Sequence, residues 1–143
     1  MSAETPDYRD AELVLKIYDL RREAVMRASR DTMNSKFLPK TYEEFIAVTK
    51  PDHPMNAAFR QVSTFWEMVY GMVHHGIVHP EYFVENNAEG MLVFAKVAPY
   101  LERFRKEGSA TAFQHAEWVS KNTQVGRARF EMFAKRIQAQ ISK

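Results

Sequence analysis

The chain has 143 residues, of which 45% are apolar and 13% aromatic, so a single domain with a sizeable core is expected. It contains no cysteine, which excludes disulfide bonds, thiolate metal sites and a cysteine nucleophile. The net charge is only +2, but six lysines and arginines follow residue 120 against the single acid Glu131, so the positive charge is concentrated at the C-terminal end.

The first predicted helix runs from about residue 6 to residue 34. Thr5, Pro6 and Asp7 have the order typical of a helix start, with a capping hydroxyl, then proline, then an acid. Apolar residues then recur at helical spacing as Leu13, Ile17, Leu20 and Ala24. We expect residues 1–6 to be flexible, and we expect the arginines of this helix to face solvent: Arg21, Arg22, Arg27 and Arg30.

A shorter helix is predicted after a break at residues 36–40. Thr41 and Glu44 have the spacing of a capping box, which indicates a helix start. The prolines within residues 51–54 favour an extended linker, because the residue before a proline avoids the helical region. Asn56 is expected to cap the helix that follows.

The longest apolar pattern lies in residues 57–75. Five positions form one helical stripe: Phe59, Val62, Trp66, Val69 and Val73. A helix this apolar is typical of the centre of a bundle, so we expect Trp66 to be largely buried. Gly76 stands where a left-handed residue is expected to end the helix.

Two helices are predicted between residues 81 and 106. Pro80 suits the first turn of a short helix with His79 as its cap. A longer helix then runs over residues 88–106 with an expected kink at Pro99, and Gly108 ends it.

The C-terminal part predicts two more helices. One starts at Ser109 or Thr111, and the last starts at Thr123 with an apolar stripe: Phe130, Phe133, Ile137 and Ile141. No alternating strand pattern and no repeat is present. We therefore expect an all-α fold, a single-domain irregular helical bundle of five to seven helices over residues 1–143.

No motif of the sequence demands a particular reaction. Phosphate-binding glycine loops, the Gly-x-Ser-x-Gly motif and the His-Glu-x-x-His motif are all missing. The candidate catalytic residues are Glu67, which lies between two apolar residues and could have a raised pKa, and His75. The candidate metal ligands are His75, His79 and Glu81. We expect neither a catalytic constellation nor a metal site, and no cofactor.

Three stretches carry a family resemblance: an aromatic-rich helix at 65–78, a proline-containing helix at 99–105 and an aromatic–Glu–Trp helix at 113–121. In this order they resemble a class of small, uncharacterised bacterial all-helical domains of unknown function, over roughly residues 60–121. These are packing motifs, and the resemblance implies no catalytic residues.

The sequence therefore favours a non-enzymatic, cytoplasmic binding or regulatory module with an unknown protein or small-molecule partner. The polar, acidic start and the lack of a long apolar stretch predict no signal peptide and no membrane span. We also expect a homodimer, because the chain has many aromatic and methionine side chains for its size. The alternatives are a helical enzyme using Glu67 with a histidine, and a weak nucleic-acid binder using the basic C-terminal helix, specific binding being unlikely.

Overall fold

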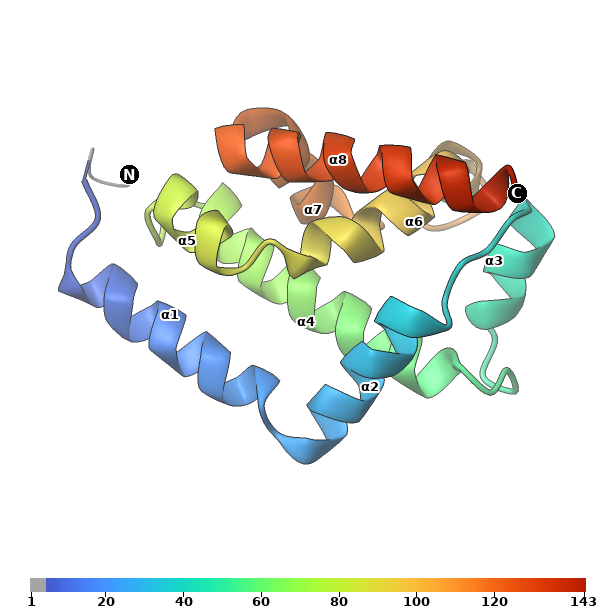
Figure 1. The fold of residues 1–143 in the computed structure, drawn as a ribbon, viewed down its shortest axis with the longest axis horizontal. Coiled ribbons are helices and arrows are strands. Elements are labelled where there is room, and N and C mark those ends of the chain that lie inside the picture. The colour runs from blue at the N-terminus through green and yellow to red at the C-terminus, as the bar shows by residue number, and fades with distance from the viewer. Residues whose placement is uncertain (1–4) are drawn as a thin grey trace.

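Residues 5–143 are described by the computed structural model, and within them the chain forms eight helices and no strand (Figure 1). The fold is all-α, as predicted, but it has more helices than the predicted five to seven. The helices are α1 Tyr8–Arg21, α2 Ala24–Ser35, α3 Tyr42–Val48, α4 Asn56–His74, α5 Pro80–Asn86, α6 Glu89–Lys106, α7 Gln114–Asn122 and α8 Gln124–Ile141. Residues 1–4, most of the segment predicted to be flexible, lie outside the described residues.

The additional helix arises because the predicted N-terminal helix is divided into α1 and α2. The carboxylate of Glu23 accepts hydrogen bonds from the backbone N–H groups of Val25 and Met26, at 2.8 and 3.0 Å, and so caps the start of a new helix. The predicted cap at Thr5 is also wrong. Asp7 caps α1 instead, in a capping box with Asp10.

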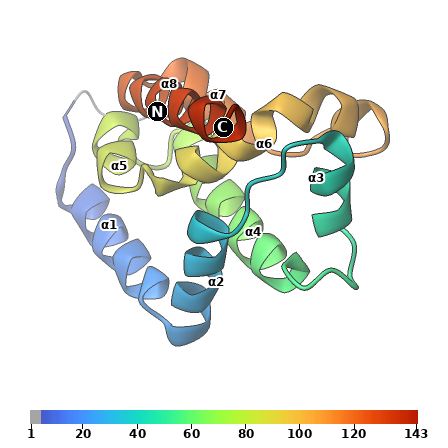
Figure 2. The same cartoon turned by 45° about the vertical axis from the view of Figure 1, so that its right-hand side comes forward.

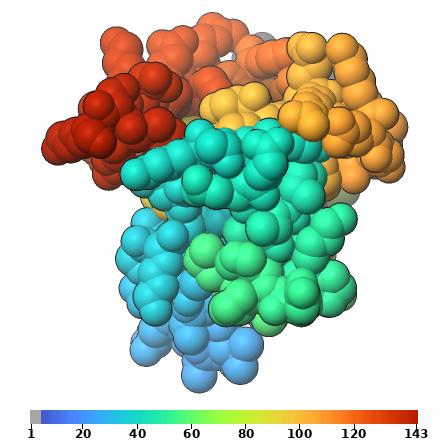
Figure 3. Space-filling model, turned by 90° about the vertical axis from the view of Figure 1, so that its right-hand side faces the viewer, coloured from blue at the N-terminus to red at the C-terminus, as the bar shows by residue number. Residues whose placement is uncertain are grey.

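α4 passes through the middle of the molecule (Figures 1 and 2). α1 and α2 form a V on one side of it, and α6, α7 and α8 lie on the other. Figure 3 shows α3 and its flanking segments covering the face between α2 and the α6–α7 end. None of the helices in residues 5–143 is long and apolar enough to cross a membrane.

α4 supplies the centre of the core, as the stripe of apolar residues predicted. Trp66 is only 2% exposed, and the four other stripe positions are buried too. Tyr70 is fully buried and donates its hydroxyl to the carbonyl of Asn87 at 2.7 Å. This hydroxyl lies so close to Gly90 that a Cβ there would be 2.5 Å from it, so the start of α6 requires glycine. Gly76 has φ 74°, the left-handed conformation predicted for it.

Two predicted helix starts are corrected by the structure. Asn56 lies inside α4, and its side-chain amide donates to the carbonyl of Val48 at 2.9 Å, so it caps the C-terminal end of α3 instead. α7 begins at Gln114 and not at Ser109 or Thr111, because Phe113 adopts a left-handed φ of 58° while its ring enters the core. Burial of the ring offsets the backbone strain at that residue.

Two of the four arginines expected in solvent are instead partly buried. Arg30 donates to both carboxylate oxygens of Glu89 at 2.7 and 2.8 Å, and Arg21 approaches the same carboxylate at 3.9 Å. Burial raises the pKa of Glu89, but the hydrogen bonds from Arg30 and the positive charges of Arg30 and Arg21 together outweigh burial, and the pKa lies below its usual value. The cluster ties the α1–α2 corner to the start of α6, whereas Arg22 and Arg27 are exposed.

Candidate functional site

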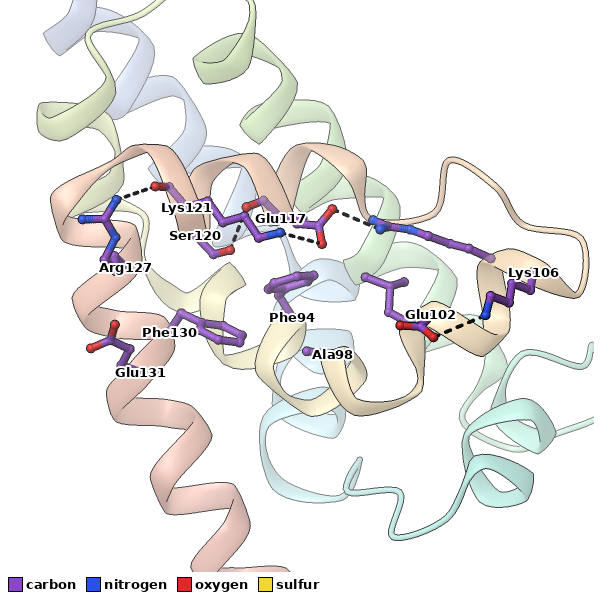
Figure 4. A pocket seen from close by; sticks show the side chains of 12 residues that line it. Phe94, Ala98, Glu102, Lys106, Glu117, Ser120, Lys121, Arg127, Phe130 and Glu131 are labelled. Atoms are coloured by element: carbon purple, nitrogen blue, oxygen red, sulfur yellow. Dashed lines mark hydrogen bonds and ion pairs between the residues drawn. The ribbon is translucent and has the colours of Figure 1, made fainter.

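A groove with a volume of about 870 Å³ lies between α6, α7 and α8 (Figure 4). We call it the α6–α8 groove. Its lining comes from all three helices: Phe94, Ala98, Leu101, Glu102, Arg105, Lys106, Glu117, Ser120, Lys121, Arg127, Phe130 and Glu131.

The floor of the α6–α8 groove is apolar. Phe94, Ala98 and Leu101 follow one another at helical spacing and line it from α6. From α8 the ring of Phe130 approaches that of Phe94, with centroids 5.4 Å apart. Phe94 and Leu101 belong to the core, so the groove opens directly onto the apolar interior.

The rim of the groove consists of charged side chains that are mostly paired with one another. Glu117 accepts hydrogen bonds from Arg105 at 3.0 Å and from Lys121 at 3.4 Å. Lys106 pairs with Glu102 one turn away, at 3.4 Å. Since both signs are present and largely paired, the rim confers little preference for a charged ligand.

The groove remains open because α8 packs closely only at part of its length. Its start is fixed by two caps. Thr123 accepts from the N–H of Gly126 at 2.9 Å, as expected of the predicted start residue, and Glu81 accepts from the N–H groups of Gln124 and Val125 at 2.8 and 3.1 Å. Beyond this start only Ile137 is fully buried. The predicted apolar stripe of α8 therefore packs on the rest of the molecule, but Phe130, Phe133 and Ile141 are only half-buried.

A second, shallower depression of about 560 Å³ lies between α4 and α7. It brings together the two candidate catalytic residues, Glu67 and His75, and adds His115 from α7. The carboxylate of Glu67 accepts hydrogen bonds from the backbone N–H groups of His115 and Ala116, at 3.2 and 2.7 Å. Glu67 therefore caps α7 and uses both oxygens in doing so.

Three histidines meet beside this depression. The Nδ1 atoms of His74 and His115 are 2.9 Å apart, and the ring of His74 stacks on Trp118 with centroids 4.6 Å apart. Burial lowers the pKa of His74, and the neighbouring His115 and His75 lower it further. The sequence did not indicate this cluster, because His115 is 41 residues away from His74 along the chain.

The candidate metal ligands have structural partners of their own. As predicted, His79 caps α5: its ring Nδ1 accepts a hydrogen bond from the backbone N–H of Tyr82 at 3.1 Å. The backbone N–H of His79 donates to the carboxylate of Asp10. Glu81 caps α8, as described above, and His75 lies with His115. Across residues 5–143, no three histidine, aspartate or glutamate side chains are arranged to hold a metal ion.

The sequence patterns did not single out one buried cation, Lys96. Lys96 on α6 is 5% exposed, and its amine donates to the carbonyls of Met33 and Asn34, at 2.8 and 3.1 Å. These carbonyls belong to the last turn of α2, where a helix end favours positive charge. Burial lowers the pKa of Lys96 to about 8. The lysine thus caps α2 from a different helix.

These observations define a small all-helical domain with an apolar groove. The model of a family described as a domain of unknown function, DUF4760, matches residues 8–123, and the chain belongs to that family. The match includes residues 60–121 and confirms the resemblance to an uncharacterised helical domain. It ends one residue before α8, which supplies one wall of the groove. Comparisons with curated proteins and with solved structures found no match.

Proposed function

We propose that the domain is a non-enzymatic binding module and that its partner occupies the α6–α8 groove. The observation that carries this proposal is a groove of about 870 Å³ with an apolar floor. Binding sites for small molecules commonly enclose about 300–1,000 Å³ and are mainly apolar with a few polar groups at the edge. The same floor can accept the apolar side chains of a protein segment.

The chemistry of the lining defines what the partner must offer. Because the rim charges pair with one another, affinity comes mainly from burial of apolar surface, at about 25 cal/mol for each Å² removed from water. Phe130 contributes the aromatic wall on α8. We therefore expect a partner with an apolar or aromatic contact surface and without a high net charge.

A fluorescent apolar probe, anilinonaphthalene sulfonate (ANS), tests the groove with two matched variants. Phe130 and Phe133 are both half-buried on α8, but only Phe130 lines the groove. We expect the folded protein to bind ANS, Phe130→Ala to weaken binding about tenfold, and Phe133→Ala to leave binding nearly unchanged. Equal loss in both variants, or no ANS binding by the folded wild-type protein, would contradict the proposal.

The enzyme alternative is favoured by one observation, the shared depression of Glu67, His75 and His115. A catalytic acid or base needs a pKa near the working pH. In the structure both carboxylate oxygens of Glu67 are instead occupied by the cap that it provides for α7. Carboxyl ¹³C NMR measures the titration of Glu67 directly. Titration near pH 7 would support the enzyme, and ionisation throughout neutral pH would support the capping role alone.

We further propose that the protein is cytoplasmic and self-associates as a two-fold dimer. The lack of cysteine suits a reducing compartment. Among residues 5–143, seven large apolar side chains are exposed, five of them within residues 8–25, on α1 and the start of α2. Sedimentation velocity measures the association. A monomer at protein concentrations of about tens of micromolar would exclude the dimer.

A further inference from the structure

Three imidazole rings meet where the C-terminal end of α4 packs on α7. The Nδ1 atoms of His74 and His115 are 2.9 Å apart, and the ring of His75 lies 5.5 Å from each of the other two. At this Nδ1–Nδ1 distance one nitrogen must donate a hydrogen and the other must accept it. The contact therefore requires that at least one of the two rings is neutral.

The histidine contact is one of three interactions that attach α7 to α4. The ring of His74 stacks on that of Trp118 at an interplanar angle of 14°. The carboxylate of Glu67 accepts hydrogen bonds from the backbone N–H groups of His115 and Ala116 in the first turn of α7. The first two turns of α7 are thus fixed by the histidine contact, the ring stack and the carboxylate cap.

The other side of α7 lines the α6–α8 groove through Glu117, Ser120 and Lys121. α7 has only nine residues. Because both contacts are made by this one helix, a displacement of α7 from α4 would also displace the wall of the groove. The histidine contact and the groove lie on opposite sides of the same short helix.

We propose that the His74–His115 pair is a proton-operated latch that sets the position of α7 and, through it, the shape of the groove. In neutral solution the two rings share one hydrogen and hold α7 against α4. When both rings are protonated, neither can accept, and two cations lie side by side. The effect on ligand binding rests on the proposed function of the groove, whereas the latch itself does not.

The charged groups around the latch set the direction of its response. The titratable groups that act on His74 are His75 and Glu67 from α4 and His115 from α7. Burial and the two other histidines lower the pKa of His74, and Glu67 acts in the opposite direction with a smaller effect. The lowered pKa of His74 therefore favours its neutral form at pH 7. Because the unfolded chain binds protons more readily here, stability is lost as the pH falls below about 6.5.

The latch is tested by NMR on the full chain between about pH 7.5 and about pH 5. We expect the imidazole signals of His74 and the backbone amide signals of Ser120 and Lys121 to shift with one common midpoint. His74→Gln should abolish this transition at the two amides. His53→Gln is the matched control, because His53 lies in the loop before α4, away from the α4–α7 contact, and it should preserve the transition.

Amides of α7 that do not titrate, or that titrate equally in His74→Gln, would overturn the latch. His115→Gln removes the other member of the pair and provides the same test if the first variant does not fold. ANS binding then measures the coupling to the groove, with an expected change in affinity of about fivefold between the two pH values that His74→Gln removes. Unchanged ANS affinity would overturn the coupling. If ANS does not bind at either pH, the proposed function fails, and the common midpoint alone decides the latch.

Discussion

α4 and α8 are both amphipathic helices with a continuous apolar stripe in the sequence, yet they are buried to very different extents. α4 buries its whole stripe, including Phe59, Trp66 and Val73, between the α1–α2 side and the α7 side of the molecule. α8 contacts α5, α6 and α7, but only Gly126 and Ile137 are fully buried. The family match contains α4 and ends before α8.

The difference shows that an apolar stripe can serve two purposes. Where helices surround it, as for α4, the stripe builds the core and leaves no space for a ligand. Where one side is uncovered, as for α8, half-exposed side chains such as Phe130 become the wall of a groove. We therefore attribute stability mainly to α4 and propose that binding falls mainly to the surface between α8 and its neighbours.

The largest expected effect comes from removing α8. Phe130 and Phe133 pack against the core cluster and Ile137 is buried, and full burial of such a side chain is worth about 1.5–3 kcal/mol before entropy is subtracted. Deletion of residues 124–143 should therefore unfold the domain or destabilise it more than any single substitution. Thermal unfolding followed by circular dichroism measures this, and an unchanged melting temperature would show that α8 is only loosely attached.

Truncation of Trp66 tests the contribution of α4 to stability. Trp66→Ala should lower the free energy of unfolding by about 3–5 kcal/mol, because it leaves a large cavity at the centre of α4. Trp118→Ala is the matched control on a half-buried tryptophan and should cost less. Urea titration gives both values. A loss of less than about 1 kcal/mol for Trp66→Ala would place Trp66 outside the essential core.

The free energy of unfolding is expected to depend on pH through Lys96. Its pKa of about 8 in the folded protein lies below the value of about 10.4 expected in the unfolded chain. The unfolded chain therefore binds more protons between these values, and the free energy of unfolding should rise with pH by up to about 3 kcal/mol.

Lys96→Met should abolish that rise, while Lys106→Met, at an exposed position, should retain it. Urea titrations at about pH 7 and about pH 10 compare the three proteins. An identical pH dependence in the wild-type protein and Lys96→Met would mean that the amine is not desolvated in the folded state.

The smallest effect is expected for nucleic acid binding by α8. Arg127, Arg129, Lys135 and Arg136 are exposed, which suits the solvated side of a docked helix. Attraction of these charges to phosphates weakens steeply with salt. Filter binding at about 150 mM salt should therefore detect no retention of random duplex or single-stranded DNA at low micromolar protein. Tight retention would indicate that α8 binds nucleic acid.

Sequence patterns predicted those features that depend on residues close together in the chain. The α4 stripe, the left-handed Gly76 and the start of α8 at Thr123 all follow from helical spacing or from local capping. The break between α1 and α2 depends equally on local contacts, but Glu23 is not among the common capping residues.

The features that were not predicted join helix ends to residues far away in the chain. Glu67 caps α7 from 48 residues away, Glu81 caps α8 from 43, and Lys96 caps α2 from 63. Each of these side chains, taken alone in the sequence, is typical of a solvated or catalytic residue. Only the packing of the helices reveals its partner. For the same reason the groove, which combines three helices, could not be predicted from one stretch of sequence.

An NMR titration of ANS into the ¹⁵N-labelled full chain tests directly whether ligands bind in the α6–α8 groove. We expect amide shifts to concentrate on groove residues of all three walls, such as Ala98, Ser120 and Phe130, and to be much smaller around Met68 in the depression between α4 and α7. Shifts confined to that depression, or spread evenly over α1 and α2, would contradict the assignment of binding to the α6–α8 groove.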